Sequence, residues 1–344
     1  MKRLATKGIL ILAAAILPGA CINQYPDGEG VDPTLVNVRA TVTLDTGYTA
    51  MAAGNNRNTT AVSARADSRG NDAWQWRVIV DAYRRGERER VSRQVTTVAD
   101  IPAGEGKIIL PLDLRLRALD YTLVAWCDRV PAGTTDDALY NTADARAVTC
   151  AEPYPGGSPD RQCARGTTRL DLTAYRDEWN AHAPLDLTME SPLARWRLVA
   201  TDVRRFMEKT AADRAAGRTY SARFSYAFYL PAGVDAMTGM PCHSLTGVTF
   251  TLPLDLPADG SREMEIGSDH VFAGNDASTV SLTIEVVDDT GKVVSSLRGL
   301  EVPYQRGFLT TARGAFLTPE TEGGVHIDPD YEGDIEVDLD QFKV

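Results

Sequence analysis

The sequence has few histidines and none of the short signatures that usually mark a catalytic centre. His182, His243, His270 and His326 are its 4 histidines, and no two of them have metal-ligand spacing. No Gly-x-Ser-x-Gly turn, Gly-Lys-Ser/Thr phosphate loop or His-Glu-x-x-His helix is present. No Cys-x-x-Cys pair occurs either, so zinc or thiol redox chemistry has no support. We therefore predict that the protein is not an enzyme and has no cofactor.

Positive charge is also scarce. The chain has 36 lysines and arginines against 47 aspartates and glutamates, which gives a formal net charge of −11. Recognition of a phosphate backbone needs a basic stripe, and the sequence contains none. The chain is therefore not expected to bind nucleic acid, and its acidity is accounted for by solubility.

Long apolar runs are absent after the first residues. The one run begins at Gly8, ends at Leu17 and follows Lys2, Arg3 and Lys7. At about ten residues it is too short to cross a hydrocarbon core of roughly 30 Å as a helix. Residues 1–20 are therefore predicted to be a signal peptide that is removed.

Small residues lead from this run into Cys21, although Pro18 stands where such signals usually have Leu. A basic start, a short apolar run and small residues before a cysteine are typical of a bacterial lipoprotein, in which the cysteine that begins the mature chain is acylated. A plain signal peptide with an incidental cysteine is the alternative. One acyl chain such as palmitate anchors only marginally, so stable attachment needs the two or three chains of a lipoprotein N-terminus. We expect lipidation at Cys21, a linker over residues 21–33 and a place in the outer membrane.

The remaining cysteines are Cys127, Cys150, Cys163 and Cys242, an even number in a compartment where disulfides form. Cys150 and Cys163 flank a stretch rich in Pro and Gly, so a disulfide between them would staple an exposed loop. Closing a loop of this length is worth about 3 kcal/mol. Free thiols are the alternative. Cys127 lies in an alternating apolar run and is expected to be a buried thiol, while the state of Cys242 is open.

Strand patterns dominate the mature chain, and they predict an all-β protein made of two β-sandwich domains. The alternating or apolar runs fall at residues 35–44, 74–82, 107–114, 120–128, 168–173, 193–200, 218–230, 280–286, 292–301, 308–318 and 334–339. One short helix is expected from an N-cap at Asp202 to about Ala216. The two domains are predicted at residues 34–190 and 191–344.

Several of these segments resemble a known family, the fimbrillin-type lipoproteins of the Bacteroidales. The run from Asp120 to Asp128 resembles a strand of that group in which Asp-Tyr is followed by aliphatic residues, Trp and Asp. Further similar phrases occur at residues 194–202, 224–226, 229–231, 302–303, 306–307, 309–311, 313–314, 316–318, 323–324 and 327–328. These are structural phrases rather than catalytic signatures. The resemblance implies two transthyretin-like β-sandwich domains in tandem.

The resemblance also implies a role. The FimB-like members are anchor or accessory subunits of cell-surface fimbriae, and their partners are other fimbrial subunits. Shaft subunits of the group are trimmed after an arginine, which removes a first strand and opens a groove that a strand of the next subunit fills. Anchors keep the first strand. The run from Leu35 to Leu44 corresponds to that strand here, and the candidate trimming sites are Arg39, Arg57, Arg65 and Arg69.

Two other features are candidate binding sites. Asp328, Asp330, Glu332 and Asp334 resemble the opening of a calcium loop, but Leu339 stands where the bidentate carboxylate is needed, so a solvated acidic turn is favoured. Among the tryptophans, Trp74 and Trp76 share a face with valines and are expected in the core, whereas Trp126 and Trp179 are better candidates for exposure.

The sequence thus predicts a lipid-anchored accessory or anchor subunit of a fimbria that assembles by strand complementation at the cell surface. The alternative is a glycan-binding outer-membrane lipoprotein of a polysaccharide-uptake system. The side of the membrane that the protein faces stays open.

Overall fold

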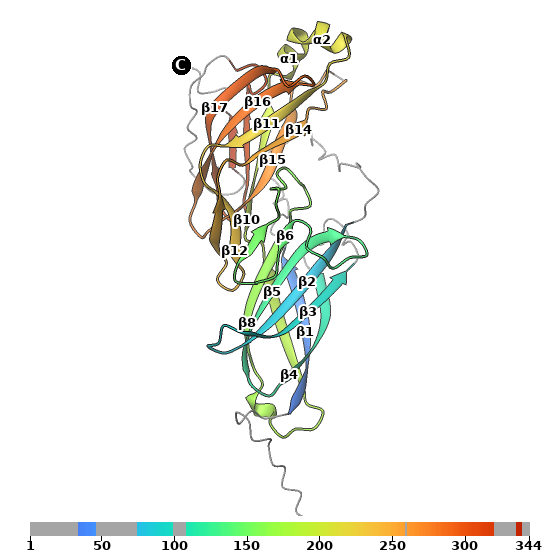
Figure 1. The fold of residues 1–344 in the computed structure, drawn as a ribbon, viewed down its shortest axis with the longest axis vertical. Helices are drawn as coiled ribbons and strands as arrows, with labels where there is room; N and C mark the ends of the chain where they lie inside the picture. The colour runs from blue at the N-terminus through green and yellow to red at the C-terminus, as the bar shows by residue number, and fades with distance from the viewer. Residues whose placement is uncertain (1–33, 46–73, 99–107, 259, 320–334, 339–344) are drawn as a thin grey trace, which may run out of the picture.

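The computed structural model describes residues 34–45, 74–98, 108–258, 260–319 and 335–338. The described chain is built of β-strands with two short α-helices and one turn of 3-10 helix, which confirms the predicted all-β class. Two lobes lie end to end (Figure 1). The N-terminal lobe is defined here as the described residues up to 190, and the C-terminal lobe as those from 193 onward. No helix among the described residues is long and apolar enough to cross a membrane.

A seven-stranded sheet forms the N-terminal lobe, with strands in the order β3-β2-β5-β8-β9-β1-β4. The sheet rolls over so that its two outermost strands, β3 and β4, come into contact. The strands are β1 (Leu35–Asp45), β2 (Trp74–Arg84), β3 (Arg90–Val98), β4 (Ile108–Arg117), β5 (Asp120–Pro131), β8 (Cys163–Asp171) and β9 (His182–Glu190). This lobe is therefore one continuous sheet closed over a core.

Alternation in the sequence explains that core. The apolar residues of β1 from Val36 to Leu44 are at most 1% exposed, whereas Arg39 between them is exposed. Strand β9 repeats the pattern, with apolar side chains at every second position from Ala183 to Met189 pointing inward. Since successive side chains of a strand point to opposite faces, one face of each strand packs against the core and the other meets solvent.

Two four-stranded sheets face each other in the C-terminal lobe, in the orders β15-β10-β18-β19 and β14-β11-β16-β17. Their strands are β10 (Leu193–Ala200), β11 (Tyr220–Tyr226), β14 (Thr249–Pro253), β15 (Met264–Phe272), β16 (Ser278–Asp288), β17 (Val293–Tyr304), β18 (Leu309–Gly314) and β19 (Ile335–Asp338). Trp196 and Leu198 of β10 share one buried cluster with Phe224 of β11 and Ile284 of β16. The lobe is thus a sandwich closed around aromatic side chains.

Two predicted elements of this lobe differ from the structure. The expected single helix is two, α1 (Val203–Lys209) and α2 (Ala211–Ala215), because Thr210 interrupts it. The expected uninterrupted strand over residues 218–230 breaks into β11 and β12 (Leu230–Asp235). At that break Phe228 is 71% exposed, although it continues the alternating inward face of β11. The change of sheet between the two strands removes Phe228 from the core.

Strands from both lobes share a fourth sheet at the junction, in the order β13-β12-β7-β6. From the N-terminal lobe come β6 (Tyr140–Asn141) and β7 (Val148–Cys150), and from the C-terminal lobe β12 and β13 (Met240–Leu245). In the pairing of β7 with β12, Val148 lies opposite Val234 and Thr149 opposite Gly233. The lobes are therefore joined by backbone hydrogen bonds as well as by the chain itself.

Candidate functional site

The first strand, β1, lies between β9 and β4 and is paired with both. It runs parallel to β9 from Asn37 opposite His182, and antiparallel to β4 from Leu35 opposite Arg117. Both edges of β1 are thus hydrogen-bonded, and its apolar face fills the centre of the N-terminal core. The space between β9 and β4 is thus occupied by the protein's own first strand.

One candidate trimming site lies within this strand. The Arg39 side chain is 75% exposed and forms an ion pair with Asp113 of β4 at 3.7 Å. The peptide bond after Arg39 belongs to a strand that is paired on both sides, and proteolysis is usual at exposed loops rather than in such strands. Arg57, Arg65 and Arg69 lie outside the described residues, so their candidacy stays a prediction.

A buried polar cluster locks the two lobes together around Asp269 of β15. Arg161 donates to Asp269 Oδ1 at 2.7 Å, and both side chains are 0% exposed. The hydroxyls of Tyr154 and Tyr226 donate to Asp269 Oδ2 at 2.9 and 2.8 Å, and the backbone N–H of Gly157 donates to Oδ1 at 3.1 Å. The carboxylate therefore has four donors, three of them from the N-terminal lobe.

The loop that carries Arg161 is pressed into the junction. The Arg161 guanidinium also lies 4.5 Å from the centre of the Tyr154 ring and donates to Cys150 Sγ at 3.2 Å. Burial opposes its charge, but Cys150, Tyr154 and Asp269 hold the pKa of Arg161 well above its ordinary value. At Gly156 the Phe250 ring of the C-terminal lobe leaves no room for a Cβ. The sequence predicts an exposed loop between Cys150 and Cys163, but in the structure this loop is packed between the two lobes.

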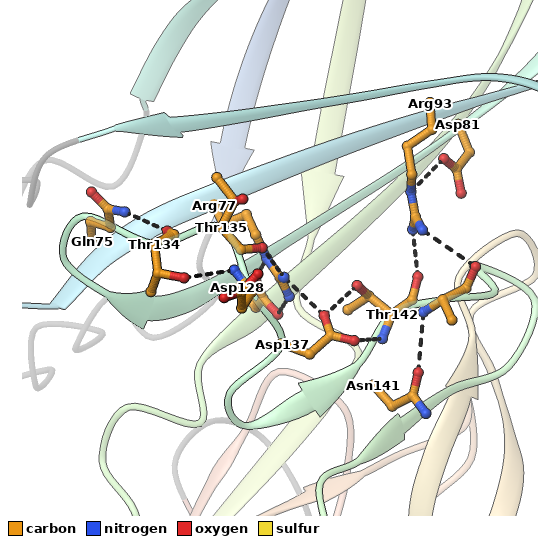
Figure 2. Close-up of polar contacts among 12 residues, drawn as sticks. Gln75, Arg77, Asp81, Arg93, Asp128, Thr134, Thr135, Asp137, Asn141 and Thr142 are labelled. Atoms are coloured by element: carbon orange, nitrogen blue, oxygen red, sulfur yellow. Dashed lines mark hydrogen bonds and ion pairs between the residues drawn. The ribbon is translucent and has the colours of Figure 1, made fainter.

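A second polar network holds the segment after β5 against the outer face of β2 (Figure 2). Arg77, only 2% exposed, donates to both carboxylate oxygens of Asp128 at 2.9 and 2.7 Å. It also donates to Asp137 Oδ1 at 2.8 Å, and Asp137 Oδ2 accepts the backbone N–H of Thr142 at 2.9 Å. Burial raises the pKa of Asp137, but the Thr142 and Arg77 donors outweigh this and lower it below its ordinary value. The network positions the chain that leads into β6 and β7.

These anchored segments cover a third core at the junction. Trp126 of β5 is 1% exposed and meets Tyr140 edge-on, with ring centroids 5.4 Å apart. Tyr140 in turn lies 5.9 Å from Phe272 of β15. The aromatic chain runs from the N-terminal sheet into the C-terminal one, so the junction is packed like a protein interior rather than hinged.

His270, next to Asp269 along β15, gives the junction a pH dependence. Burial, followed by Arg161 and Arg195, lowers the pKa of His270 well below its ordinary value. The unfolded chain therefore binds a proton on His270 that the folded chain does not bind, and the stability of the fold falls as the pH drops below about 6.5.

We expect His270 to contribute at most about 1.4 kcal/mol per pH unit to that loss of stability. Urea unfolding between pH 7 and pH 5 should show a smaller slope for His270→Gln, and an unchanged slope would contradict the assignment.

The predicted Cys150–Cys163 disulfide is wrong for this structure, in which both are free thiols. Cys150 Sγ is engaged by Arg161, and both cysteines are buried in the junction rather than exposed on a loop. Burial raises the pKa of Cys150, and raises those of Cys127 and Cys163 well above the usual range. Cys127 is buried, as expected, and Cys242 is an exposed free thiol.

Thiol reagents should reveal this difference in exposure. In a chain that begins after Cys21, we expect one thiol to react rapidly in the native protein, because only Cys242 is both free and exposed. The three buried thiols should react only on unfolding. Cys242→Ser should abolish the rapid reaction. A native protein that yields one further thiol instead of three when unfolded without reductant would restore the disulfide.

The tryptophans divide differently from the prediction. Trp76 is 4% exposed and half-buried Trp74 precedes it, in keeping with a packing role. Trp126 is buried in the junction core, contrary to the expected exposure. Trp179 is 93% exposed, as predicted. The alternation along β5 placed Trp126 correctly on the face away from Leu123, but the segment after β5 covers that face.

The other predicted site residues lie outside the described part of the chain. They are Cys21, with its signal peptide and linker, and the acidic turn of Asp328, Asp330, Glu332 and Asp334. Within the described ranges no group of three His, Cys, Asp or Glu side chains could hold a metal ion.

Comparison with solved structures finds matches of low sequence identity and low TM-score. The fimbrial anchor protein Mfa2 from Porphyromonas gingivalis is 11% identical, with 76% of this chain and 82% of that chain covered and a TM-score of 0.38. A fimbrial assembly protein from Parabacteroides distasonis is 10% identical over 81% and 92%, with a TM-score of 0.36. A polysaccharide-binding candidate from Bacteroides thetaiotaomicron is 8% identical over 76% and 79%, with a TM-score of 0.40.

No protein with a curated description matches the chain. A protein-family model covers residues 33–343, which is nearly the whole of the predicted mature chain. The chain therefore belongs to the family of unknown function DUF6562.

Proposed function

We propose that the protein is a lipid-anchored accessory or anchor subunit of a cell-surface fimbria, attached to the outer membrane through Cys21. The observation that carries this proposal is the state of β1. Its apolar side chains from Val36 to Leu44 are almost completely buried and both its edges are paired, so the chain fills its own groove. In the group that the sequence resembles, a retained first strand is the mark of an anchor.

The rigid junction agrees with a part that carries load. A buried ion pair, a shared sheet and a continuous aromatic core oppose rotation between the lobes. We place the boundary between the two domains at Ser191-Pro192, between β9 and β10, and infer that the junction transmits force from a bound fimbrial partner to the membrane. The partner would join by strand complementation, in which a strand pairs with an edge left open in the fold.

Isolation of fimbriae from the native bacterium tests the proposal. The protein should co-purify with a fimbrial polymer, and deletion of its gene should release fibres into the medium. Fibres that stay on cells lacking the protein would contradict the anchor role. A glycan-binding role would instead require thermal stabilisation by a saccharide. It has less support because four of the five tryptophans are buried or half-buried.

A further inference from the structure

Trp179 lies in the loop between the 3-10 turn (Thr173–Tyr175) and β9, and its side chain is 93% exposed. Two residues in the left-handed region flank it, Asp177 with φ 63° and Asn180 with φ 57°. This backbone is uncommon outside glycine and needs support from neighbouring structure. The Asp177 N–H donates to Thr34 Oγ1 at 3.2 Å, next to the start of β1. The loop thus presents the indole to solvent from a backbone that is held in place.

This loop lies where the chain enters the fold. Besides the contact with Asp177, the Thr34 carbonyl accepts the N–H of Ala118, and the Ala181 carbonyl accepts the N–H of Asn37. In Figure 1 the start of β1 lies at the end of the N-terminal lobe that faces away from the C-terminal lobe. Trp179 and the entry of the chain therefore share one end of the molecule.

The length of the preceding chain limits how far this end can stand from a membrane. Cys21 and Thr34 are separated by 34 − 21 = 13 residues in the sequence. Even a fully extended chain of that length spans at most about 45 Å. A lipid at Cys21 would therefore keep the end that carries Trp179 within about 45 Å of the bilayer.

The charges beside Trp179 permit close approach to a lipid surface. Arg176, Asp177 and Glu178 precede it and are exposed, and Arg117 lies opposite Leu35 at the start of β1. These two arginines and two carboxylates cancel, so together they add no net charge beside Trp179. Leu35 is itself 41% exposed, which adds apolar surface beside the loop.

We infer that Trp179 docks into the headgroup region of the membrane and sets the protein upright on it. The inference rests on the lipid anchor of the proposed function. An indole combines a large apolar ring with one polar N–H, which is why tryptophan is enriched at membrane interfaces. One exposed tryptophan binds a bilayer weakly, but a short tether raises its effective concentration to about the millimolar range. The tether and the indole together fix which end faces the lipid.

Quenching of tryptophan fluorescence by brominated lipid tests this contact. The lipidated full-length mature protein is reconstituted into vesicles of phosphatidylethanolamine and phosphatidylglycerol, with ordinary or brominated acyl chains. The fluorescence of Trp179 is obtained as the difference between the wild-type protein and Trp179→Phe. In vesicles its emission maximum should shift to shorter wavelength, and in brominated vesicles more than half of its intensity should be lost. The remaining four tryptophans should not be quenched.

A matched control places a tryptophan on the other lobe. Phe228 is 71% exposed in the turn between β11 and β12, so Phe228→Trp in the Trp179→Phe background should report an exposed indole that brominated lipid does not quench. Quenching at position 228 but not at 179 would overturn the inference, as would an unquenched Trp179. If Trp179 is not quenched by lipid but is buried by a co-purified fimbrial subunit, the inference is also overturned, and the residue belongs to a protein contact instead.

A second tether separates this inference from the proposed function. The chain from residue 22 carries an N-terminal hexahistidine and binds vesicles that contain a nickel-chelating lipid. If the native protein fails to float with membranes, the lipid anchor is wrong, yet quenching of Trp179 on the nickel tether still supports docking. If the native protein floats and Trp179 stays unquenched on both tethers, the anchor stands and the docking inference fails.

Discussion

Replacing Asp269 with alanine is expected to lower the free energy of unfolding by about 3–5 kcal/mol, because it leaves a buried arginine without its counter-charge. Arg161 and Asp269 are both 0% exposed, so water cannot replace the lost carboxylate. The hydroxyls of Tyr154 and Tyr226 and the N–H of Gly157 would lose their acceptor as well. Urea unfolding followed by circular dichroism measures the loss.

Two variants serve as controls for this loss. Asp113→Ala removes an exposed ion pair with Arg39 and should change stability by no more than about 0.5 kcal/mol. Arg161→Met combined with Asp269→Asn removes both charges while keeping an acceptor for the tyrosines, and it should cost less than Asp269→Ala alone. A loss below about 1 kcal/mol for Asp269→Ala would show that the junction is hydrated rather than dry.

Removal of the first strand should have an effect of similar or greater size. Five apolar side chains of β1, from Val36 to Leu44, are at most 1% exposed, and each contributes about 1.5–3 kcal/mol if large and less if it is alanine. The sum approaches the whole stability of a typical domain, about 5–15 kcal/mol. A chain that lacks residues 1–45 should therefore lose cooperative unfolding of the N-terminal lobe. Adding a synthetic peptide of residues 34–45 should restore it.

The peptide experiment has an internal control. A peptide with Val38→Asp and Val42→Asp keeps its backbone pairing groups but presents charges to the core, and it should not restore folding. Equal rescue by both peptides would show that the buried face of β1 is unimportant. Failure of the native peptide to restore folding would contradict the expectation that the loss comes from the missing strand alone.

Much of the fold could be predicted because its signals are local. Alternation predicts β1, β2, β5, β10 and β16 within a few residues of their observed bounds. Strand β9 alternates just as regularly from Ala183 to Met189 but was missed. Pro184 lies inside this strand, and a proline within an alternating run counts against a strand.

The junction could not be predicted because its partners are distant in the sequence. Arg161 and Asp269 are separated by 108 positions and Tyr154 and Asp269 by 115, and neither pair forms a motif. A Pro- and Gly-rich stretch favours an exposed loop unless another lobe covers it, and nothing near residues 151–162 indicates that cover. The disulfide prediction fails for the same reason, because the even number of cysteines and the Pro- and Gly-rich stretch between Cys150 and Cys163 do not indicate that the other lobe buries them.

We propose that this two-lobed protein holds a fimbria to the outer membrane through lipid at Cys21. Cys21→Ser in the native bacterium tests it most directly, with the protein and fibres measured in the membrane and in the medium. We expect both to leave the membrane together while the protein remains folded. Retention of protein and fibres at the membrane would contradict the account.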